Sequence, residues 1–238
     1  MSALSGRTAV VTGASRGIGA GIAEALGKEG VRVALVARTE AKLKEQAARI
    51  KGAFPVVCDV TDPTSVEMAV TRISAELKGG PDILVNNAGI FSVSVVEETL
   101  PDLFIDIIET NLVAPFLFVR AFIAEMKRRQ TGHIVTIGSV ADRTIYTGNA
   151  AYSAAKFGLR AVHEVLRAEL RGSGVRTSLI SPAATDTEMW EGVTVTDPVA
   201  NPHSKRPMLD PGDVVRAVMF ALMQPEKVNI DELRLSHS

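Results

Sequence analysis

The sequence predicts one α/β domain over residues 1–238, with a doubly wound parallel sheet of about seven strands and helices on both faces. Short aliphatic runs alternate with helical patterns along the whole chain, and this alternation is typical of parallel sheets. The length of 238 residues suits one such domain, and an apolar fraction of 46% provides a large core. No repeat, low-complexity tract or linker interrupts the pattern, so we expect no second domain.

The strand predictions rest on short runs of aliphatic and β-branched residues, which are typical of strands buried on both faces. In chain order these runs lie near Thr8–Thr12, Arg32–Ala37, Pro55–Asp59, Ile83–Asn86, His133–Ile137, Arg176–Ile180 and Ile230–Leu235. The helix predictions rest on apolar residues spaced three or four apart. In chain order they cover about Gly17–Glu29, Glu40–Lys51, Pro63–Lys78, Pro101–Arg129, Ala151–Arg171 and Pro211–Met223. The last helix has a clear start signal, with Asp210 as N-cap and Pro211 at the first helical position.

A segment after the sixth strand departs from the pattern. Between about residues 183 and 209 the periodicity fades, and Pro198, Pro202 and Pro207 punctuate the chain. Segments of this length without secondary structure are usually functional lids or disordered. Because this one follows a strand, it should lie above the carboxyl ends of the strands, where ligands bind in such sheets. We expect a substrate lid here, with a plain surface loop as the alternative.

A glycine-rich turn, Gly13-Ala-Ser-Arg-Gly17-Ile-Gly19, joins the first strand to the first helix. Gly13 permits a tight turn, Gly17 lets a pyrophosphate approach the backbone, and Gly19 allows close packing of helix and strand. The helix N-terminus then faces the phosphates with unpaired N–H groups. A glycine-rich turn alone is a weak signal, but between a strand and a helix it predicts a dinucleotide-binding site.

Tyr152 and Lys156 lie four residues apart on a predicted helix, so their side chains share one face. A phenol has a pKa of about 10, and an ammonium about 4 Å away at an effective dielectric of about 20 supplies roughly the 3 units that bring it near 7. The spacing therefore makes Tyr152 a candidate general acid/base. The alternative for this pair alone is a half-buried helical tyrosine with a solvated lysine.

Several motifs in order resemble the short-chain dehydrogenase/reductase family, from Arg7 to about Leu235. Residues 12–19 are similar to its T-G-x-x-x-G-x-G turn, and residues 86–89 to its N-N-A-G motif. Four further residues match its catalytic tetrad in order and approximate spacing, namely Asn111, Ser139, Tyr152 and Lys156. The resemblance implies a Rossmann-type fold and hydride transfer between a nicotinamide and a carbonyl carbon.

The resemblance also assigns roles to individual residues. Tyr152 would donate or accept the proton, Ser139 would polarise the substrate oxygen, and Asn111 would hold a water that connects Lys156 to solvent. Lys156 would lower the pKa of Tyr152 and hold the nicotinamide ribose. The implied cofactor contacts are Gly13, Ser15, Arg16, Gly17, Ile18, Gly19, Arg38, Asp59, Val60, Asn87, Ala88, Gly89, Tyr152, Lys156, Pro182 and Thr187.

The cofactor preference is read from Arg38, which directly follows the second strand. NAD-preferring members of the resembled family place an aspartate there, whereas a guanidinium pairs with a 2′-phosphate in bidentate fashion. Arg16 in the glycine turn matches a second basic position of NADP-preferring relatives. We therefore expect NADP(H). In the family's P-G segment, Ala183 replaces the glycine and would add strain if that position required a positive φ.

Pro115 lies four residues after Asn111 in a predicted helix. Proline has no N–H to donate to the Asn111 carbonyl, and its ring crowds that oxygen. We expect the helix Pro101–Arg129 to kink near Asn111–Pro115 and to free this carbonyl for water. The alternative is a kink that Pro115 only tolerates.

Composition argues against several classes of protein. The net charge of −1 gives no electrostatic reason to expect nucleic acid or an anionic membrane as partner. Cys58 is the single cysteine, so a reducing compartment is expected. We see no signal peptide and no apolar run approaching 18 residues, which favours a soluble, cytoplasmic protein. His133 and His163 lack a metal-ligand pattern, so we interpret both as structural and expect no metal.

The substrate is the least determined feature. Residues 228–235 resemble the C-termini of the serine 3-dehydrogenase, 3-hydroxy acid dehydrogenase and clavulanate aldehyde reductase branch, which favours a small carbonyl or alcohol. The basic run Lys127–Arg129 could instead dock an acidic carrier, as in a 3-oxoacyl-(acyl-carrier-protein) reductase, or complement the helix dipole. The non-enzyme alternative is an NADP-binding regulatory protein. The presence of all four tetrad residues argues against it. Trp190 could pack on substrate or anchor its loop.

The helix Ala151–Arg171 is apolar on more than one face. An amphipathic surface helix needs only one apolar stripe, so the second face must be buried elsewhere. We expect a subunit interface there. The resemblance implies a homotetramer or homodimer.

Overall fold

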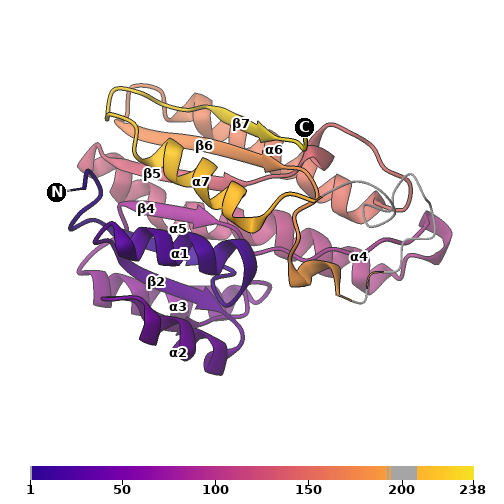
Figure 1. Cartoon of the computed structure of the whole chain (residues 1–238), viewed down its shortest axis with the longest axis horizontal. Coiled ribbons are helices and arrows are strands. Elements are labelled where there is room, and N and C mark those ends of the chain that lie inside the picture. Colours follow the sequence, from indigo (N-terminus) through magenta and orange to yellow (C-terminus); the bar gives the residue numbers. More distant parts are fainter. Residues whose placement is uncertain (1, 192, 194–207) are drawn as a thin grey trace.

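The computed structural model describes residues 2–191, 193 and 208–238 and confirms the predicted α/β fold (Figure 1). Its seven parallel strands have the order β3-β2-β1-β4-β5-β6-β7. The strands are β1 Thr8–Thr12, β2 Arg32–Ala37, β3 Phe54–Val57, β4 Ile83–Asn86, β5 Gly132–Ile137, β6 Val175–Pro182 and β7 Glu232–Leu235. The helices are α1 Gly17–Lys28, α2 Glu40–Arg49, α3 Pro63–Leu77, α4 Pro101–Ile108, α5 Ala114–Arg129, α6 Ala150–Glu169 and α7 Pro211–Leu222. Most of the expected lid, residues 192 and 194–207, lies outside the described part.

Two hydrophobic cores lie on opposite faces of the sheet. Successive residues of a strand point to opposite faces, so Val11 belongs to one core and Val10 to the other. Helices α1 and α7 cover the first face side by side, and α3 and α5 cover the second (Figure 1). Burial on both faces explains why the strands are continuous apolar runs rather than alternating ones.

The strand order places a crevice at the carboxyl ends of the sheet. The chain winds outward from β1 through β2 to β3, then returns so that β4 pairs with the other side of β1. The register aligns Val10 with Ala34 and with Leu84, so the three strands end at similar heights. In doubly wound sheets, ligands bind where the winding direction reverses. The loops after β1 and β4 therefore border the expected ligand site.

Some element boundaries differ from the sequence predictions. Strand β3 covers Phe54–Val57, so Asp59 lies beyond it, in the loop that leads to α3. Pro55 is tolerated because β3 is an edge strand. Short 3₁₀ turns at Val96–Glu98 (η1), Val140–Asp142 (η3) and Glu188–Trp190 (η4) were not predicted.

The expected helix Pro101–Arg129 is interrupted as predicted, but by a π-helical turn rather than a simple kink. This turn, η2, covers Glu109–Val113 and separates α4 from α5. The Ala114 N–H donates to the Glu109 carbonyl, five residues back, which is the π-helical spacing. Pro115 begins the next helix and cannot donate to Asn111. The proline signal therefore located the break, while the wider turn needed the structure.

The same stretch bears on the membrane expectation. Within the described residues, Pro101–Arg129 is long and apolar enough to span a membrane by length and composition, with a mean hydropathy of 1.6. The sequence prediction relied on uninterrupted apolar runs and missed it. This is weak evidence for a span, since core helices pass the same test, and Phe118 and Phe122 of α5 are buried in the second core.

His133 and His163 are buried in the sheet region, which supports their structural interpretation. His133 Nε2 lies 2.9 Å from Ser178 Oγ, and His163 Nδ1 lies 3.0 Å from Thr136 Oγ1. Burial lowers the pKa of His133 to about 3 and that of His163 to about 4. Both imidazoles are therefore neutral in the folded protein at pH 7. The described residues contain no cluster of His, Cys, Asp or Glu that could hold a metal ion.

These two histidines predict a loss of stability in mild acid. The unfolded chain binds protons below its imidazole pKa of about 6.5, whereas the folded protein resists them until about pH 4. The free energy of unfolding should therefore be about 2 kcal/mol lower per histidine at pH 5 than at pH 7. Urea unfolding at the two pH values measures this loss. His133→Gln should remove about half of it, and an equal loss in parent and variant would contradict the assignment.

Candidate active site

The glycine turn packs tightly against the loop after β4. Gly13 has φ of +66°, and a Cβ there would lie 2.9 Å from Ala88 Cα. A Cβ on Gly19 would lie 2.3 Å from the Gly13 carbonyl oxygen. Asn87 holds the turn in place, because its Nδ2 donates to the Thr12 carbonyl at 2.9 Å. Any side chain at Gly13 or Gly19 would force these two loops apart.

The N-terminus of α1 opens beside this turn. Arg16 is its N-cap, no side-chain cap hydrogen bond forms within the described residues, and the first turn holds no acidic residue. Its free N–H groups therefore remain available to an anion. Gly17 has φ of +55°, and a Cβ there would lie 3.4 Å from Thr187 Cγ2 and 3.6 Å from Glu188 Oε2. Ser15 and Ile18 lie in the same turn and are partly buried.

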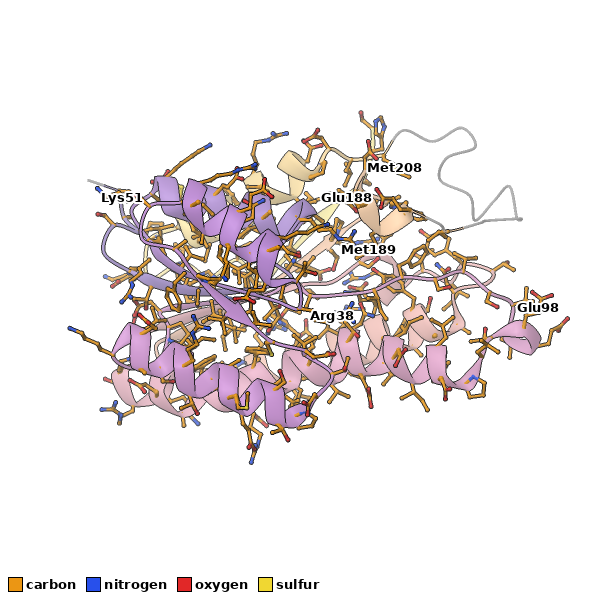
Figure 2. All side chains as sticks on the ribbon, turned by 90° about the horizontal axis from the view of Figure 1, so that it is seen from below. Arg38, Lys51, Glu98, Glu188, Met189 and Met208 are labelled. Atoms are coloured by element: carbon orange, nitrogen blue, oxygen red, sulfur yellow. The ribbon has the colours of Figure 1, made fainter. Side chains whose placement is uncertain are left out.

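The ends of β2 and β3 bring Arg38 close to Asp59. The Cys58 N–H donates to the Ala37 carbonyl at 3.0 Å, which aligns the two strand ends. Asp59 Oδ1 accepts from the backbone and hydroxyl of Thr61, and these bonds, with the Arg38 charge, lower the pKa of Asp59. Arg38 and Arg16 are exposed, and neither forms an ion pair with a described residue (Figure 2). Val60 follows and is buried.

The structure brings Ser139, Tyr152 and Lys156 together at the end of β5. Ser139 follows the strand after one glycine and accepts from the Ala141 N–H at 3.1 Å. Lys156 Nζ donates to the Ile137 carbonyl at 3.0 Å and lies 5.6 Å from the centroid of the Tyr152 ring. Lys156 is only 5% exposed. One face of α6 therefore presents a phenol and an ammonium to the strand that carries Ser139.

The pKa values differ from the sequence prediction. Burial raises the pKa of Tyr152 to about 12, the Ser139 hydroxyl opposes this, and the Asp142 carboxylate adds to it. Burial lowers the pKa of Lys156 to about 8, and Asp142 opposes this. The pKa of Tyr152 is therefore raised in this structure, not lowered as predicted, because burial dominates. At neutral pH Tyr152 holds its proton and Lys156 is mostly charged.

Asn111 lies in the π-helical turn and contacts the loop after β4. Its Nδ2 donates to the Ile90 carbonyl at 3.0 Å and to the Ile107 carbonyl at 2.9 Å. A Cβ on Gly89 would lie 2.7 Å from Asn111 Oδ1, so the glycine is needed for this contact. Asn111 Oδ1 is buried and has no protein partner among the described residues. Asn111 therefore ties the break in the helix to the Asn87–Gly89 segment.

The loop after β6 reaches over the glycine turn. Pro182 ends the strand, and the Ala183 N–H donates to the Leu235 carbonyl at 2.8 Å. Ala183 is not among the described residues with positive φ, so the condition for strain at this position is not met. Thr187 caps η4 and accepts from the Met189 N–H at 3.4 Å. Thr187 Cγ2 lies 3.4 Å from the point that a Cβ on Gly17 would occupy, which places Thr187 above the turn.

An aromatic side chain that sequence reasoning did not assign, Phe91, packs against Tyr152. The Phe91 ring packs edge-on against Tyr152 with centroids 4.9 Å apart, and against Trp190 at 4.7 Å. Trp190 Nε1 also donates to the Thr185 carbonyl at 3.0 Å, so the indole anchors its loop. Phe91 lies two residues after the N-A-G motif, and that position was the only available signal. Asp142, which is fully buried, was also missed.

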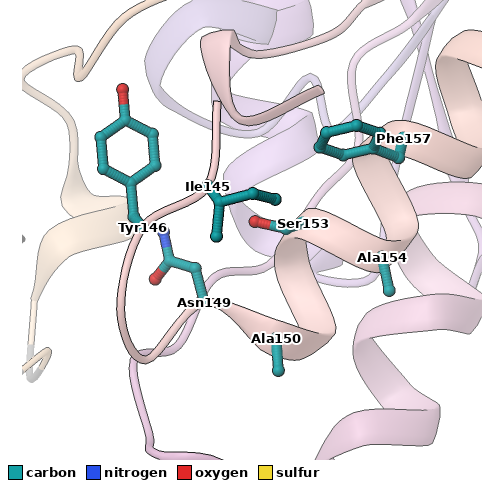
Figure 3. Close-up of a pocket in the computed structure, with 7 residues that line it drawn as sticks. All are labelled: Ile145, Tyr146, Asn149, Ala150, Ser153, Ala154 and Phe157. Atoms are coloured by element: carbon teal, nitrogen blue, oxygen red, sulfur yellow. The ribbon is translucent and has the colours of Figure 1, made fainter. Parts of the chain in front are cut away.

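A hollow of about 310 Å³ lies beside α6, and its lining does not include Tyr152 or Lys156 (Figure 3). Its lining is mostly apolar and includes none of the four tetrad residues: Ile145, Tyr146, Asn149, Ala150, Ser153, Ala154 and Phe157. Ser153 Oγ and Asn149 Oδ1 are buried there without a protein partner among the described residues. The apolar second face predicted for this helix is therefore present.

Comparison with known proteins identifies the family. Residues 7–197 match the family described as short chain dehydrogenase. An uncharacterized oxidoreductase of Staphylococcus saprophyticus is 35% identical over 98% of both chains. Glycine betaine reductase of Emericella nidulans is 36% identical over 97% of this chain, which spans 18% of that longer protein. The protein belongs to the short-chain dehydrogenase family.

Solved structures agree with this assignment. A metagenomic short-chain oxidoreductase in complex with NADP has a TM-score of 0.83 and 33% identity, with 100% of both chains covered. An alcohol dehydrogenase of Thermococcus sibiricus complexed with 5-hydroxy-NADP has a TM-score of 0.85 and 29% identity, and 96% of this chain is covered. The likeness therefore extends over the whole described fold.

Proposed function

We propose that the protein is an NADP(H)-dependent oxidoreductase that transfers a hydride between the nicotinamide and a small carbonyl or alcohol substrate. The carrying observation is the group formed by the half-buried Tyr152 and the buried Ser139 and Lys156 at the carboxyl end of β5. It combines a protonated phenol, a nearby ammonium and a hydroxyl at the carboxyl ends of the strands. The two similar structures described with NADP and 5-hydroxy-NADP support the cofactor.

The residues present fit a dinucleotide with a 2′-phosphate. Close packing leaves no room for a side chain at Gly13 or Gly19, and the uncapped α1 N-terminus is suited to the pyrophosphate. Arg38 and Arg16 are exposed cations for the 2′-phosphate, and Asp59 with Val60 borders the adenine side. Ser15, Ile18, Asn87, Ala88, Pro182 and Thr187 would line the rest of the site.

The cofactor supplies or accepts the hydride, and this chain's residues handle the proton. In carbonyl reduction, Tyr152 donates its proton to the oxygen, while the Ser139 hydroxyl polarises that oxygen. The Lys156 ammonium then stabilises the phenolate that remains and holds the nicotinamide ribose. Asn111 would connect Lys156 to solvent through a water at its backbone carbonyl, which Pro115 cannot engage.

The aromatic residues beside Tyr152 favour a small apolar carbonyl substrate. Phe91 packs against the Tyr152 ring, and Trp190 packs against Phe91. The C-terminal resemblance separately favours a small free carbonyl compound over a carrier-bound chain. The acyl-carrier alternative loses support at Lys127–Arg129, because Arg129 already pairs with Asp82 at 3.1 Å and bonds the Pro81 carbonyl at 2.7 Å.

The assembly and location follow from the same features. Ile145, Phe157 and Val165 are 74%, 40% and 57% exposed on or beside the outer side of α6. A second copy of the chain packed there would cover them, so we propose a homodimer or homotetramer. With one cysteine and no net excess of positive charge, the protein is proposed to be cytoplasmic, with no nucleic-acid or membrane partner.

A substrate panel tests the function. NADPH oxidation should be measured with aromatic and aliphatic aldehydes and ketones, with 3-hydroxy acids and serine in reverse, and with a 3-oxoacyl carrier substrate. We expect turnover with a small free carbonyl. Turnover with the carrier-bound substrate alone would favour the acyl-carrier reductase. NADPH binding without any turnover would favour the regulatory protein.

The pKa values predict how the reaction depends on pH. Carbonyl reduction needs protonated Tyr152 and charged Lys156, so its rate should fall as the pH rises through about 8. Alcohol oxidation needs the phenolate of Tyr152, whose pKa is about 12, so it should rise with pH over the range where the protein stays folded. Initial rates in both directions between about pH 6 and 10 measure this. A reduction rate that increases above pH 8 would contradict the assigned roles.

A further inference from the structure

A buried carboxylate lies behind the active-site residues without a role in the chemistry described above. Asp142 belongs to η3, the short turn that follows Ser139, and its side chain is 0% exposed. An unpaired buried carboxylate is costly, so its partners must be strong. Asp142 accepts from Ser181 Oγ on β6 at 2.8 Å and from Arg143 Nε at 2.8 Å.

These contacts fix the segment that carries Ser139. The Asp142 N–H donates to the Ser139 carbonyl at 3.0 Å, which closes the turn. The Gly138 N–H donates to the Ile180 carbonyl at 2.8 Å, one residue before Ser181. A Cβ on Gly138 would lie 2.8 Å from Ser181 Oγ and 3.3 Å from Asp142 Oδ2. The strand end is thus clamped between β6 on one side and Lys156 on the other.

Several charged groups face this carboxylate. Arg143 also pairs with Glu232 on β7, whose side chain is 26% exposed. From α6, Lys156 and Tyr152 lie within the field of Asp142, which raises the pKa of both. Arg143 is the only cation in direct contact with the carboxylate among the described residues. The negative charge is therefore only partly neutralised on the side of the active site.

We propose that Asp142 is a positioning residue: its buried carboxylate fixes the Ser139 turn against β6 and holds a negative charge behind the Tyr152–Lys156 pair. This charge favours the ammonium of Lys156 and the phenol of Tyr152, the forms that carbonyl reduction requires. The inference rests on the proposed function, and it adds a residue outside the tetrad.

The test replaces the carboxylate with an amide of the same shape. In Asp142→Asn the rate of carbonyl reduction should fall at a lower pH than in the parent, with a shift of about one pH unit, because the carboxylate that favours the Lys156 ammonium is gone. Glu232→Gln is the matched control, because it weakens the Arg143 network but leaves the buried charge. It should cost stability without shifting the profile. An unshifted profile in Asp142→Asn would overturn the proposal and leave Asp142 as a structural anchor.

A second measurement is independent of turnover. The chain has two tyrosines, so Tyr146→Phe leaves Tyr152 as the single source of tyrosinate absorbance. In that background, Asp142→Asn should show severalfold more tyrosinate than the parent at about pH 10.5, while Glu232→Gln should match the parent. Equal tyrosinate in all three would refute the charge effect even if no substrate were found. Should Asp142→Asn fail to fold, Asp142→Ser removes the same charge with a smaller side chain.

Discussion

Tyr152→Phe should slow carbonyl reduction by at least about 10²- to 10⁴-fold, while the protein keeps its fold and its binding of NADPH. The substitution removes one hydroxyl, and the ring remains to pack against Phe91. Because the tyrosine is the only proposed proton donor to the substrate oxygen, no other group should replace it. Steady-state kinetics and NADPH titration measure the two properties separately.

Tyr146→Phe is the matched control for this variant. Tyr146 lines the hollow beside α6 and is the only other tyrosine of the chain. It should retain activity within about threefold of the parent, a change too small for the loss of a general acid. Similar activity of Tyr152→Phe and the parent would show that another group supplies the proton.

Arg38→Asp should reverse the cofactor preference. The carboxylate repels a 2′-phosphate and accepts from free ribose hydroxyls, so NADPH affinity should fall by about 10- to 100-fold while NADH binding improves. Lys51→Asp carries the same charge change at an exposed position just before β3, at the amino ends of the strands, whereas Arg38 lies at their carboxyl ends (Figure 2). It should leave both affinities unchanged. A parent protein that already prefers NADH would contradict the NADP assignment.

The fold was largely readable from the sequence because its signals are local. Continuous aliphatic runs such as Thr8–Thr12 are typical of strands buried on both faces, and all seven expected strands are present. Pro115 located the break in the long helix through its missing N–H. The error at β3 arose at an edge strand, where Pro55 is tolerated and Asp59 extended the predicted run by two residues past Val57.

The candidate site was readable where motifs are contiguous and was missed where it depends on distant contacts. The glycine turn and the Tyr152–Lys156 spacing are sequence-local. Asp142 is hydrogen-bonded by Ser181, which lies 39 residues later in the chain. Its neighbour Arg143 pairs with Glu232, which lies 89 residues after Arg143. The direction of the Tyr152 pKa shift depends on burial, which a four-residue spacing cannot reveal.

The most direct test of the proposed function is isotope transfer from the cofactor. NADPH carrying deuterium at nicotinamide C4, in each of its two configurations, should be incubated with the protein and the carbonyl that the panel selects. Mass spectrometry of the alcohol product should find one deuterium on the former carbonyl carbon from one configuration only, and Tyr152→Phe should slow its appearance. Bound NADPH with no deuterium in any product, across the whole panel, would contradict the claim that this protein transfers a hydride.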